Sequence, residues 1–307
     1  MNASDFIVKD GTLIRYEGKE RQVCIPSGVT RIAPCAFGSH VYPSAVEKIT
    51  LPDTVTALDH SAFAYCVCLR EIVLACDLSV LPFGVFRECR SLRALFVPPS
   101  VKVIEKEAFC GCSALAAVVL PEGLTEIGEG AFLFCKSLTR VSLPASLRTL
   151  GANAFLGCTA LYDVRAREGL LTVGAAAFSG CTRLAQITLP ASVEALGARA
   201  FYGCTALLQI TLASARVSLG ASVFDGVPSP LALSFGGDAA TWEEMIRPTY
   251  VAPEYETMYG ERGSYTKCYP LGHAEKEGFV CHVRTQKDGA STVSYGHAHT
   301  EDGGVMH

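Results

Sequence analysis

Residues 138–158 read LTRVSLPASLRTLGANAFLGC, and this stretch decides the fold because its pattern returns along most of the chain. Its phenylalanine is one of eight that follow one another at intervals of 23 residues without a slip. The eight are Phe63, Phe86, Phe109, Phe132, Phe155, Phe178, Phe201 and Phe224, and Phe37 precedes them by 26 residues. A fixed period in the twenties predicts a solenoid, in which each turn of the chain contacts only its neighbours.

Other residue types keep the same register around each phenylalanine. Leucine stands six residues after it in seven units, and proline stands eleven residues before it in six. Cysteine stands three residues after it in seven units, at Cys66, Cys89, Cys112, Cys135, Cys158, Cys181 and Cys204. Nine units therefore run from residue 22 to residue 231.

The local chemistry of one unit predicts its path. Val141 and Leu143 alternate with polar residues, the period-two pattern of a short strand with one buried face. Pro144 ends that strand because proline lacks the donor for the next ladder bond. Leu150 points inward from a second extended stretch, and Gly151 is expected to permit the bend that follows. Stacked units then place the nine phenylalanines in one buried row, each contributing roughly 1.5–3 kcal/mol.

The unit resembles the BspA-like leucine-rich repeat family, whose pattern is L-x-x-I-x-L-P-x-x-V-x-x-I-G-x-x-A-F-x-G-C. The predicted fold class is a leucine-rich repeat solenoid, β-rich, with short parallel strands in about nine 23-residue units and a small C-terminal appendage. The resemblance implies a bacterial or protist protein, commonly on the cell surface, used in adhesion and protein recognition. The chain shows no Leu-Pro-x-Thr-Gly sorting sequence.

Four segments follow from where the period begins and stops. Residues 1–21, with a turn at Asp10-Gly11, are expected to form an N-terminal hairpin cap. Residues 22–231 form the solenoid. Residues 232–286 are expected to be a C-terminal cap, with a short helix over 239–247, and a small β-rich appendage. Residues 287–307 have little apolar content and are expected to be a flexible tail.

Composition excludes several classes of function. The chain has 307 residues, 18% of them charged, and a net charge of −4, so nothing favours a nucleic-acid partner. No apolar run is long enough for a membrane span. The first twenty residues carry seven charges and leave no room for a secretory signal, which predicts the cytoplasm, whereas the family resemblance implies the cell surface.

Candidate chemistry is sparse. The cysteine column could suggest a metal ladder or a chain of disulfides, but a stack of small buried residues is the favoured interpretation. Cys268, His273, Cys281 and His282 have the residue types of a zinc site, but not a known zinc spacing. Phosphate-loop, HExxH and GxSxG patterns are absent. We therefore expect no cofactor, no metal and no enzymatic activity; an enzyme or metal protein centred on residues 249–307 is a third alternative.

The outward positions of the strands are those thirteen and fifteen residues before each phenylalanine. Most are polar, but three consecutive units place apolar residues there: Val73, Ala94, Phe96, Ala117 and Val119. Arg140 and Arg165 follow in the next units and complete the predicted protein-binding patch. An exposed apolar patch with a polar rim is typical of a recognition site. A tail folded over these residues is the competing interpretation, and Leu133, Phe134 and Leu156 form a rival patch on the turn side.

These observations predict a non-catalytic module that recognises a protein or peptide on its strand-side face, with adhesion among the roles the resemblance implies. The alternative is an intracellular structural or scaffold protein that acts by self-association.

Overall fold

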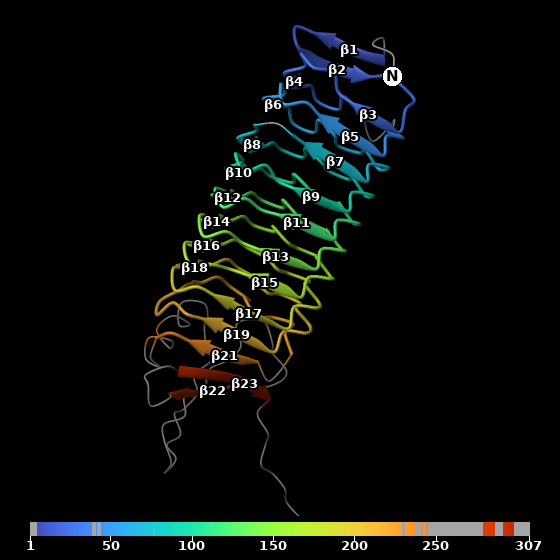
Figure 1. Ribbon diagram of the computed structural model, residues 1–307. Coiled ribbons are helices and arrows are strands. Elements are labelled where there is room, and N and C mark those ends of the chain that lie inside the picture. The colour runs from blue at the N-terminus through green and yellow to red at the C-terminus, as the bar shows by residue number, and fades with distance from the viewer. Residues whose placement is uncertain are drawn as a thin grey trace, which may run out of the picture.

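The computed structural model describes residues 5–38, 41, 44–75, 77–228, 231–237, 241, 244, 279–285 and 291–297, the last two by their backbone alone. The chain winds as a solenoid with two columns of parallel strands, as Figure 1 shows. The strands at the predicted Val141–Leu143 position form one column, and two-residue strands form the other. The predicted fold class is confirmed.

The longer strands make the strand-side column. They are β3 (Gln22–Cys24), β5 (Lys48–Leu51), β7 (Glu71–Leu74), β9 (Ala94–Phe96), β11 (Ala117–Val119), β13 (Arg140–Ser142), β15 (Asp163–Arg165), β17 (Gln186–Leu189), β19 (Gln209–Leu212) and β21 (Ala232–Phe235). Hydrogen bonding divides this column into β3-β5-β7, the pair β9-β11, and a sheet that begins β13-β15-β17-β19-β21.

The short strands make the second column. They are β4 (Arg31–Ile32), β6 (Ala57–Leu58), β8 (Val80–Leu81), β10 (Val103–Ile104), β12 (Glu126–Ile127), β14 (Thr149–Leu150), β16 (Thr172–Val173), β18 (Ala195–Leu196) and β20 (Ser218–Leu219). Each stacks on its counterpart one unit away, as Val103 does on Val80 and on Glu126.

An antiparallel hairpin begins the described chain. β1 (Phe6–Lys9) and β2 (Thr12–Tyr16) are joined by Asp10 and Gly11, which both have positive φ. That backbone matches the mirror-image turn that suits the twist of a hairpin. β2 then pairs in parallel with β4, so the hairpin adds to the short-strand column.

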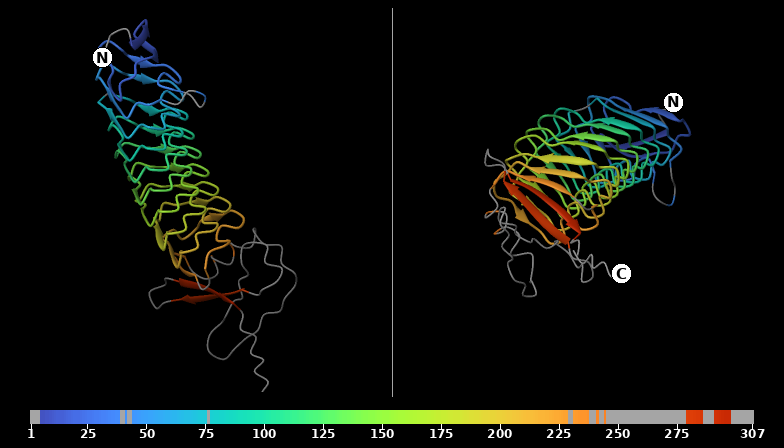
Figure 2. Two further views of the ribbon diagram at one scale, coloured as in Figure 1. Left: turned by 90° about the vertical axis from the view of Figure 1, so that its right-hand side faces the viewer. Right: turned by 90° about the horizontal axis from the view of Figure 1, so that it is seen from below.

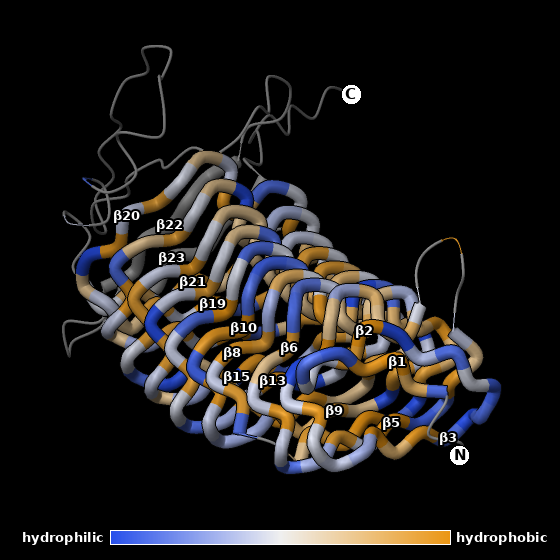
Figure 3. The backbone as a smooth tube through the Cα atoms, turned by 90° about the horizontal axis from the view of Figure 1, so that it is seen from above, coloured by the Kyte–Doolittle hydropathy of each residue, from blue (hydrophilic) through white to orange (hydrophobic). Residues whose placement is uncertain are grey.

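The core lies between the two columns and contains the phenylalanine row. The seven rings from Phe63 to Phe201 have no exposed surface. Neighbouring ring centroids are 4.9 Å apart between Phe109 and Phe132 and 6.1 Å apart between Phe201 and Phe224. The row extends beyond the phenylalanines that the period predicts, because Tyr16 stacks on Phe37 at 5.5 Å. Seen along the stack, hydrophobic segments follow the strands and hydrophilic ones gather at the turns (Figure 3).

Gly151, which the sequence suggested would permit the bend before Phe155, does not have positive φ. The left-handed residue lies two positions later, at Asn153, and every unit repeats it. Gly151 instead lets two turns approach closely. A Cβ atom at residue 151 would lie 2.5 Å from the carbonyl carbon of Gly128.

Part of the segment expected to be a flexible tail, residues 287–307, is described as a strand. β22 (Phe279–Thr285) and β23 (Ser291–His297) form an antiparallel pair, and β23 pairs antiparallel with β21 (Figure 2). The edge of an open sheet offers unpaired backbone groups to any chain nearby, which composition does not reveal. Of the helix expected over 239–247, only Thr241 and Glu244 are described, and both are helical.

Candidate functional site

The strand-side patch comes from three adjacent strands, β7, β9 and β11. Val73, Ala94, Phe96, Ala117 and Val119 alternate with buried neighbours, so period-two geometry turns all five outward. Phe96 is 62% exposed, Val119 54% and Val73 37%. Val119 stands opposite Phe96 in the parallel ladder, and Ala117 stands opposite Ala94. The structure therefore places these residues side by side, with Phe96 and Val119 at the centre.

Ion pairs border the patch on the N-terminal side. Lys48 Nζ lies 2.7 Å from Glu71 Oε1, and both residues belong to the outward set of β5 and β7. This pair leaves little net charge on that side. Next to Phe96 lies a shallow hollow of about 390 Å³ whose lining includes Leu74, Pro98 and Ser100.

The C-terminal side of the patch is basic. Arg140 on β13 and Arg165 on β15 project outward, with side chains 66% and 74% exposed. Between them lies Asp163, whose Oδ2 is 3.9 Å from Arg140 Nε and 3.4 Å from Arg165 Nε. The two arginines of the predicted site are thus brought together around one carboxylate, immediately after the apolar strands.

An aromatic side chain joins this basic group. Arg140 Nε donates a hydrogen bond to the hydroxyl oxygen of Tyr162 at 2.6 Å, and its guanidinium carbon is 5.2 Å from the ring centroid. The guanidinium carbon of Arg183 is 5.9 Å from the same centroid, within cation–π range. Tyr162 and Arg183 are residues that the sequence reasoning missed. Tyr162 precedes its strand at a position that holds a different residue type in most units, so no column marks it.

A polar hollow of about 570 Å³ lies beside the basic group. Its lining includes Tyr162, Asp163, Arg165, Gln186 and Thr188, from β15, β17 and the residue before β15. The ladder between these strands is reduced to the single pair Arg165–Thr188, whereas β17 and β19 pair over four residues.

The turn side carries the rival patch. Phe134 is 46% exposed and has a φ of +58°, whereas Leu133 and Leu156 are half-buried. A Cβ atom on Gly157 would lie 2.5 Å from the Phe134 ring, so the ring covers the backbone of the next unit. This patch has one prominent aromatic ring, in contrast to the five outward residues of the strand side.

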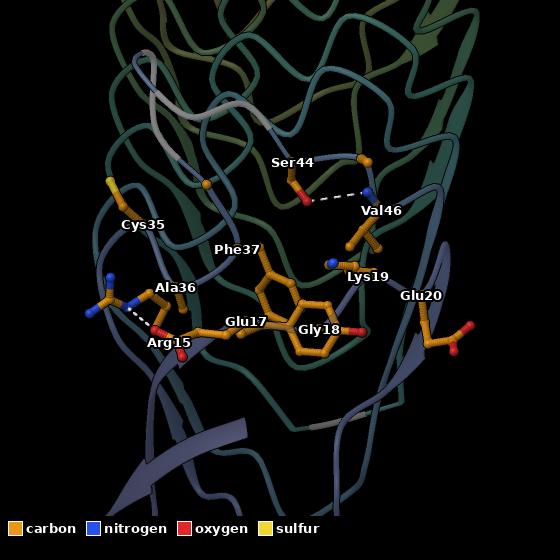
Figure 4. Close-up of a pocket in the computed structure, with 13 residues that line it drawn as sticks. Arg15, Glu17, Gly18, Lys19, Glu20, Cys35, Ala36, Phe37, Ser44 and Val46 are labelled. Atoms are coloured by element: carbon orange, nitrogen blue, oxygen red, sulfur yellow. Dashed lines mark hydrogen bonds and ion pairs between the residues drawn. The ribbon is translucent and has the colours of Figure 1, made fainter. Parts of the chain in front are cut away.

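A hollow of about 400 Å³ lies at the N-terminal end of the core, lined by the end of β2 and by residues 17–20, 35–38 and 44–46. The ring of Phe37 lies in it, and the charged side chains of Arg15 and Glu17 at its edge pair at 3.4 Å (Figure 4). No cluster of three potential metal ligands occurs among the described residues. The hollow lies beside Phe37, the first phenylalanine of the row.

The cysteine column is hydrogen-bonded to the phenylalanine row. In six units the thiol donates to the carbonyl oxygen of the preceding unit's phenylalanine, as Cys112 Sγ does to Phe86 at 3.0 Å and Cys158 Sγ does to Phe132 at 3.2 Å. All seven thiols are buried and free. Burial raises the pKa of Cys158 to about 12, although its hydrogen bond opposes the shift. These neutral thiols are poor nucleophiles and poor metal ligands.

The residues considered for zinc are not placed together. Cys268 and His273 lie outside the described residues, while Cys281 and His282 are neighbours on β22, described by backbone alone. Adjacent strand residues face opposite sides of a sheet. Among the described residues, no helix has the length and apolar character that crossing a membrane requires.

The fold defines the class: a leucine-rich repeat solenoid with a regular, extended surface. The chain belongs to the BspA type leucine rich repeat region family, whose model matches residues 16–138 and 102–231.

Several solved structures are similar. The leucine rich repeat protein of T. pallidum is 25% identical, with 81% of this chain and 96% of that chain covered and a TM-score of 0.46. A leucine-rich repeat protein of Bacteroides ovatus is 26% identical, with 66% and 69% covered and a TM-score of 0.41. A leucine rich cell surface protein of Faecalibacterium prausnitzii is 18% identical, with 80% and 94% covered and a TM-score of 0.33. No curated protein matches.

Proposed function

We propose that this protein is a non-catalytic recognition module that binds a protein or peptide on its strand-side patch. The observation that carries the proposal is the exposure of Phe96 and Val119 side by side, on a sheet face whose other outward residues are mostly polar. A large apolar side chain in water gains free energy when a partner covers it, by about 25 cal/mol for each Å² removed from solvent. The patch and its basic rim have the composition of an interface.

The division of the chain belongs to the same proposal. Residues 1–21 act as an N-terminal cap, residues 22–231 carry the binding surface, and residues 232–286 protect the last unit. Phe6 and Tyr16 support the first assignment, because Phe6 packs on Tyr16 at 5.1 Å and Tyr16 covers Phe37. The hairpin thereby shields the end of the aromatic row from water.

Binding of peptides from a displayed random library to the immobilised full chain tests the proposal. We expect Phe96→Asp to abolish binding of the enriched peptides while the melting temperature stays nearly unchanged, because the side chain points into solvent. Phe134→Asp on the turn side is the matched control, since Phe134 is also an exposed aromatic residue. Loss of binding in the Phe134 variant alone would move the site to the turn side. A large loss of stability in Phe96→Asp would show that Phe96 is buried.

Self-association of the solenoid is the alternative function, favoured by the same exposed patch if a second copy covers it. Light scattering during size-exclusion chromatography, over a hundredfold range of concentration, distinguishes the two. A constant monomer mass supports recognition of another protein. A dimer that Phe96→Asp dissociates supports the scaffold role.

The cell surface is the location that we propose first, because the resemblance to BspA-like repeats implies it, and the cytoplasm is the second. Antibody labelling of intact and permeabilised producing cells separates these locations. Labelling that requires permeabilisation would favour the cytoplasm.

A further inference from the structure

We infer that the strand-side surface accepts an extended acidic peptide segment, with an apolar residue on Phe96 and Val119 and a carboxylate at Arg140 and Arg165. This inference rests on the proposed function and names its partner's chemistry. Three observations carry it. They are the charge of the rim, the hollow between β15 and β17, and the distance from Phe96 and Val119 to the arginines.

The C-terminal rim of the patch carries more basic than acidic groups. Arg140 and Arg183 lie over the ring of Tyr162, and Asp163 is the carboxylate that pairs with Arg140 and Arg165. Three guanidinium groups against one carboxylate leave a net positive charge. Both arginines contact Asp163 through Nε. Their terminal Nη atoms can therefore make a two-pronged pair with a carboxylate of the ligand.

The hollow beside this group gives the carboxylate a place to lie. Gln186 and Thr188 line it opposite Arg165, and they add amide and hydroxyl donors without any negative charge. Gln209 and Thr211 continue the same uncharged polar pattern on β19. Asp163 is half-buried at the edge of the hollow and would disfavour a second carboxylate placed directly over it. The peptide's acidic group therefore belongs on the Arg165 side of the hollow.

Strand spacing fixes the length of the segment. β9, β11, β13 and β15 are consecutive strands of the column, so Phe96 and Arg165 are three steps apart, or about 14 Å at 4.8 Å a step. Val119 and Arg165 are two strands apart, or about 10 Å. An extended peptide advances about 3.3 Å per residue. The apolar and acidic residues should therefore be about three to five positions apart.

The apolar patch favours a peptide over a purely anionic ligand. A sulfated glycan would use the basic rim and offer little apolar surface to Phe96 and Val119. Exposed ion pairs contribute little to affinity on their own, so the apolar residue provides most of the binding and the arginines select the sequence.

The experiment uses the full chain and a phage-displayed library of random dodecapeptides. An enriched peptide is synthesised with fluorescein, together with a version in which each Glu or Asp becomes Gln or Asn. Affinities are measured by fluorescence polarisation at 50 and 500 mM NaCl. The protein variants are Arg165→Gln, the pair Arg140→Glu with Arg165→Glu, Phe96→Asp, and the control Arg199→Glu. Arg199 is matched because it also lies over a tyrosine, 5.8 Å from the Tyr202 ring.

We expect enriched peptides to carry an acidic residue three to five positions from an apolar one. Arg165→Gln should weaken binding about two- to fivefold and the double reversal about tenfold or more, with Arg199→Glu unchanged. Replacing the acidic residues of the peptide by Gln or Asn should weaken binding about as much as raising NaCl to 500 mM. Binding that is lost in Phe96→Asp but unchanged by the arginine variants and by the uncharged peptide would overturn this inference and leave the proposed function standing. Peptides unaffected by Phe96→Asp would overturn the proposed function. Direct binding of a heparin oligosaccharide, unaffected by Phe96→Asp, would contradict a peptide ligand.

Discussion

The thiol of Cys135 donates a hydrogen bond to the carbonyl oxygen of Phe109, 26 residues earlier in the chain, at 3.2 Å. The same oxygen accepts a second hydrogen bond from the backbone N–H of Cys112 at 3.1 Å. One carbonyl group thus links three positions in two units, and both side chains belong to columns that the 23-residue period defines.

Cys135→Ala should destabilise the protein by about 1–2 kcal/mol, because the change removes a buried sulfur and a weak hydrogen bond but leaves the bond from Cys112. Urea unfolding followed by circular dichroism measures the effect. Cys68→Ala is the control, since Cys68 is exposed and should change the free energy of unfolding by less than about 0.5 kcal/mol. Equal effects at the two positions would contradict a structural column.

Stability should fall as pH rises above about 9, because unfolded thiols lose their protons near pH 8.5 while buried thiols keep theirs. The pKa of Cys158 is raised to about 12 by burial, so its contribution is fully present below pH 8.5 and is lost as pH rises toward 12. Each such thiol adds about 1.4 kcal/mol per pH unit to the slope in that window. Cys158→Ala should therefore give a shallower slope between pH 9 and 11 in urea titrations. An unchanged slope would place the Cys158 thiol in water.

Phe132→Ala should cost about 3–5 kcal/mol, because it opens a cavity in the middle of the aromatic row. The Phe132 ring stacks on Phe109 at 4.9 Å and on Phe155 at 5.1 Å, so both neighbours lose a partner. Urea denaturation of the variant and of the parent protein measures the loss in free energy of unfolding. Little change in the transition midpoint would exclude a continuous buried row.

Gly151→Ala should cost about 3 kcal/mol or more, because its Cβ would collide with backbone atoms of Gly128 and Glu129, which cannot move aside as a flexible side chain could. Gly180→Ala separates this effect from backbone strain. Gly180 has a φ of +70° but its nearest obstacle is 3.7 Å away, so alanine there should cost about 1–2 kcal/mol. A smaller loss at residue 151 than at residue 180, by thermal melts of both variants, would contradict the close approach of the turns.

The repeat unit and the aromatic row could be predicted because their residues recur at one spacing. The outward positions of Phe96 and Val119 followed from the same spacing and the alternation of strand side chains. The left-handed residue two positions before each phenylalanine could not be predicted. It is glycine in two units, at Gly84 and Gly130, but Glu107, Ala176 or Arg199 in others. The stacked backbone therefore imposes a conformation that side-chain type does not mark consistently.

The Tyr162 cluster was missed for a related reason. Tyr162 contacts Arg140 and Arg183, which stand at positions where the residue type varies. The 23-residue period describes only the positions that the units share. Strand β23 was missed because its pairing depends on the free edge of β21, a property of the assembled sheet rather than of residues 291–297.

The hydrogen bond from each thiol to the phenylalanine one unit earlier gives the stack a direction. From Cys89 to Cys204 every internal unit provides a donor toward the N-terminus and an acceptor toward the C-terminus. A gene that gained or lost one whole 23-residue unit in this region would join matching ends on both sides. The length of the array can therefore change by whole units without a new core being designed.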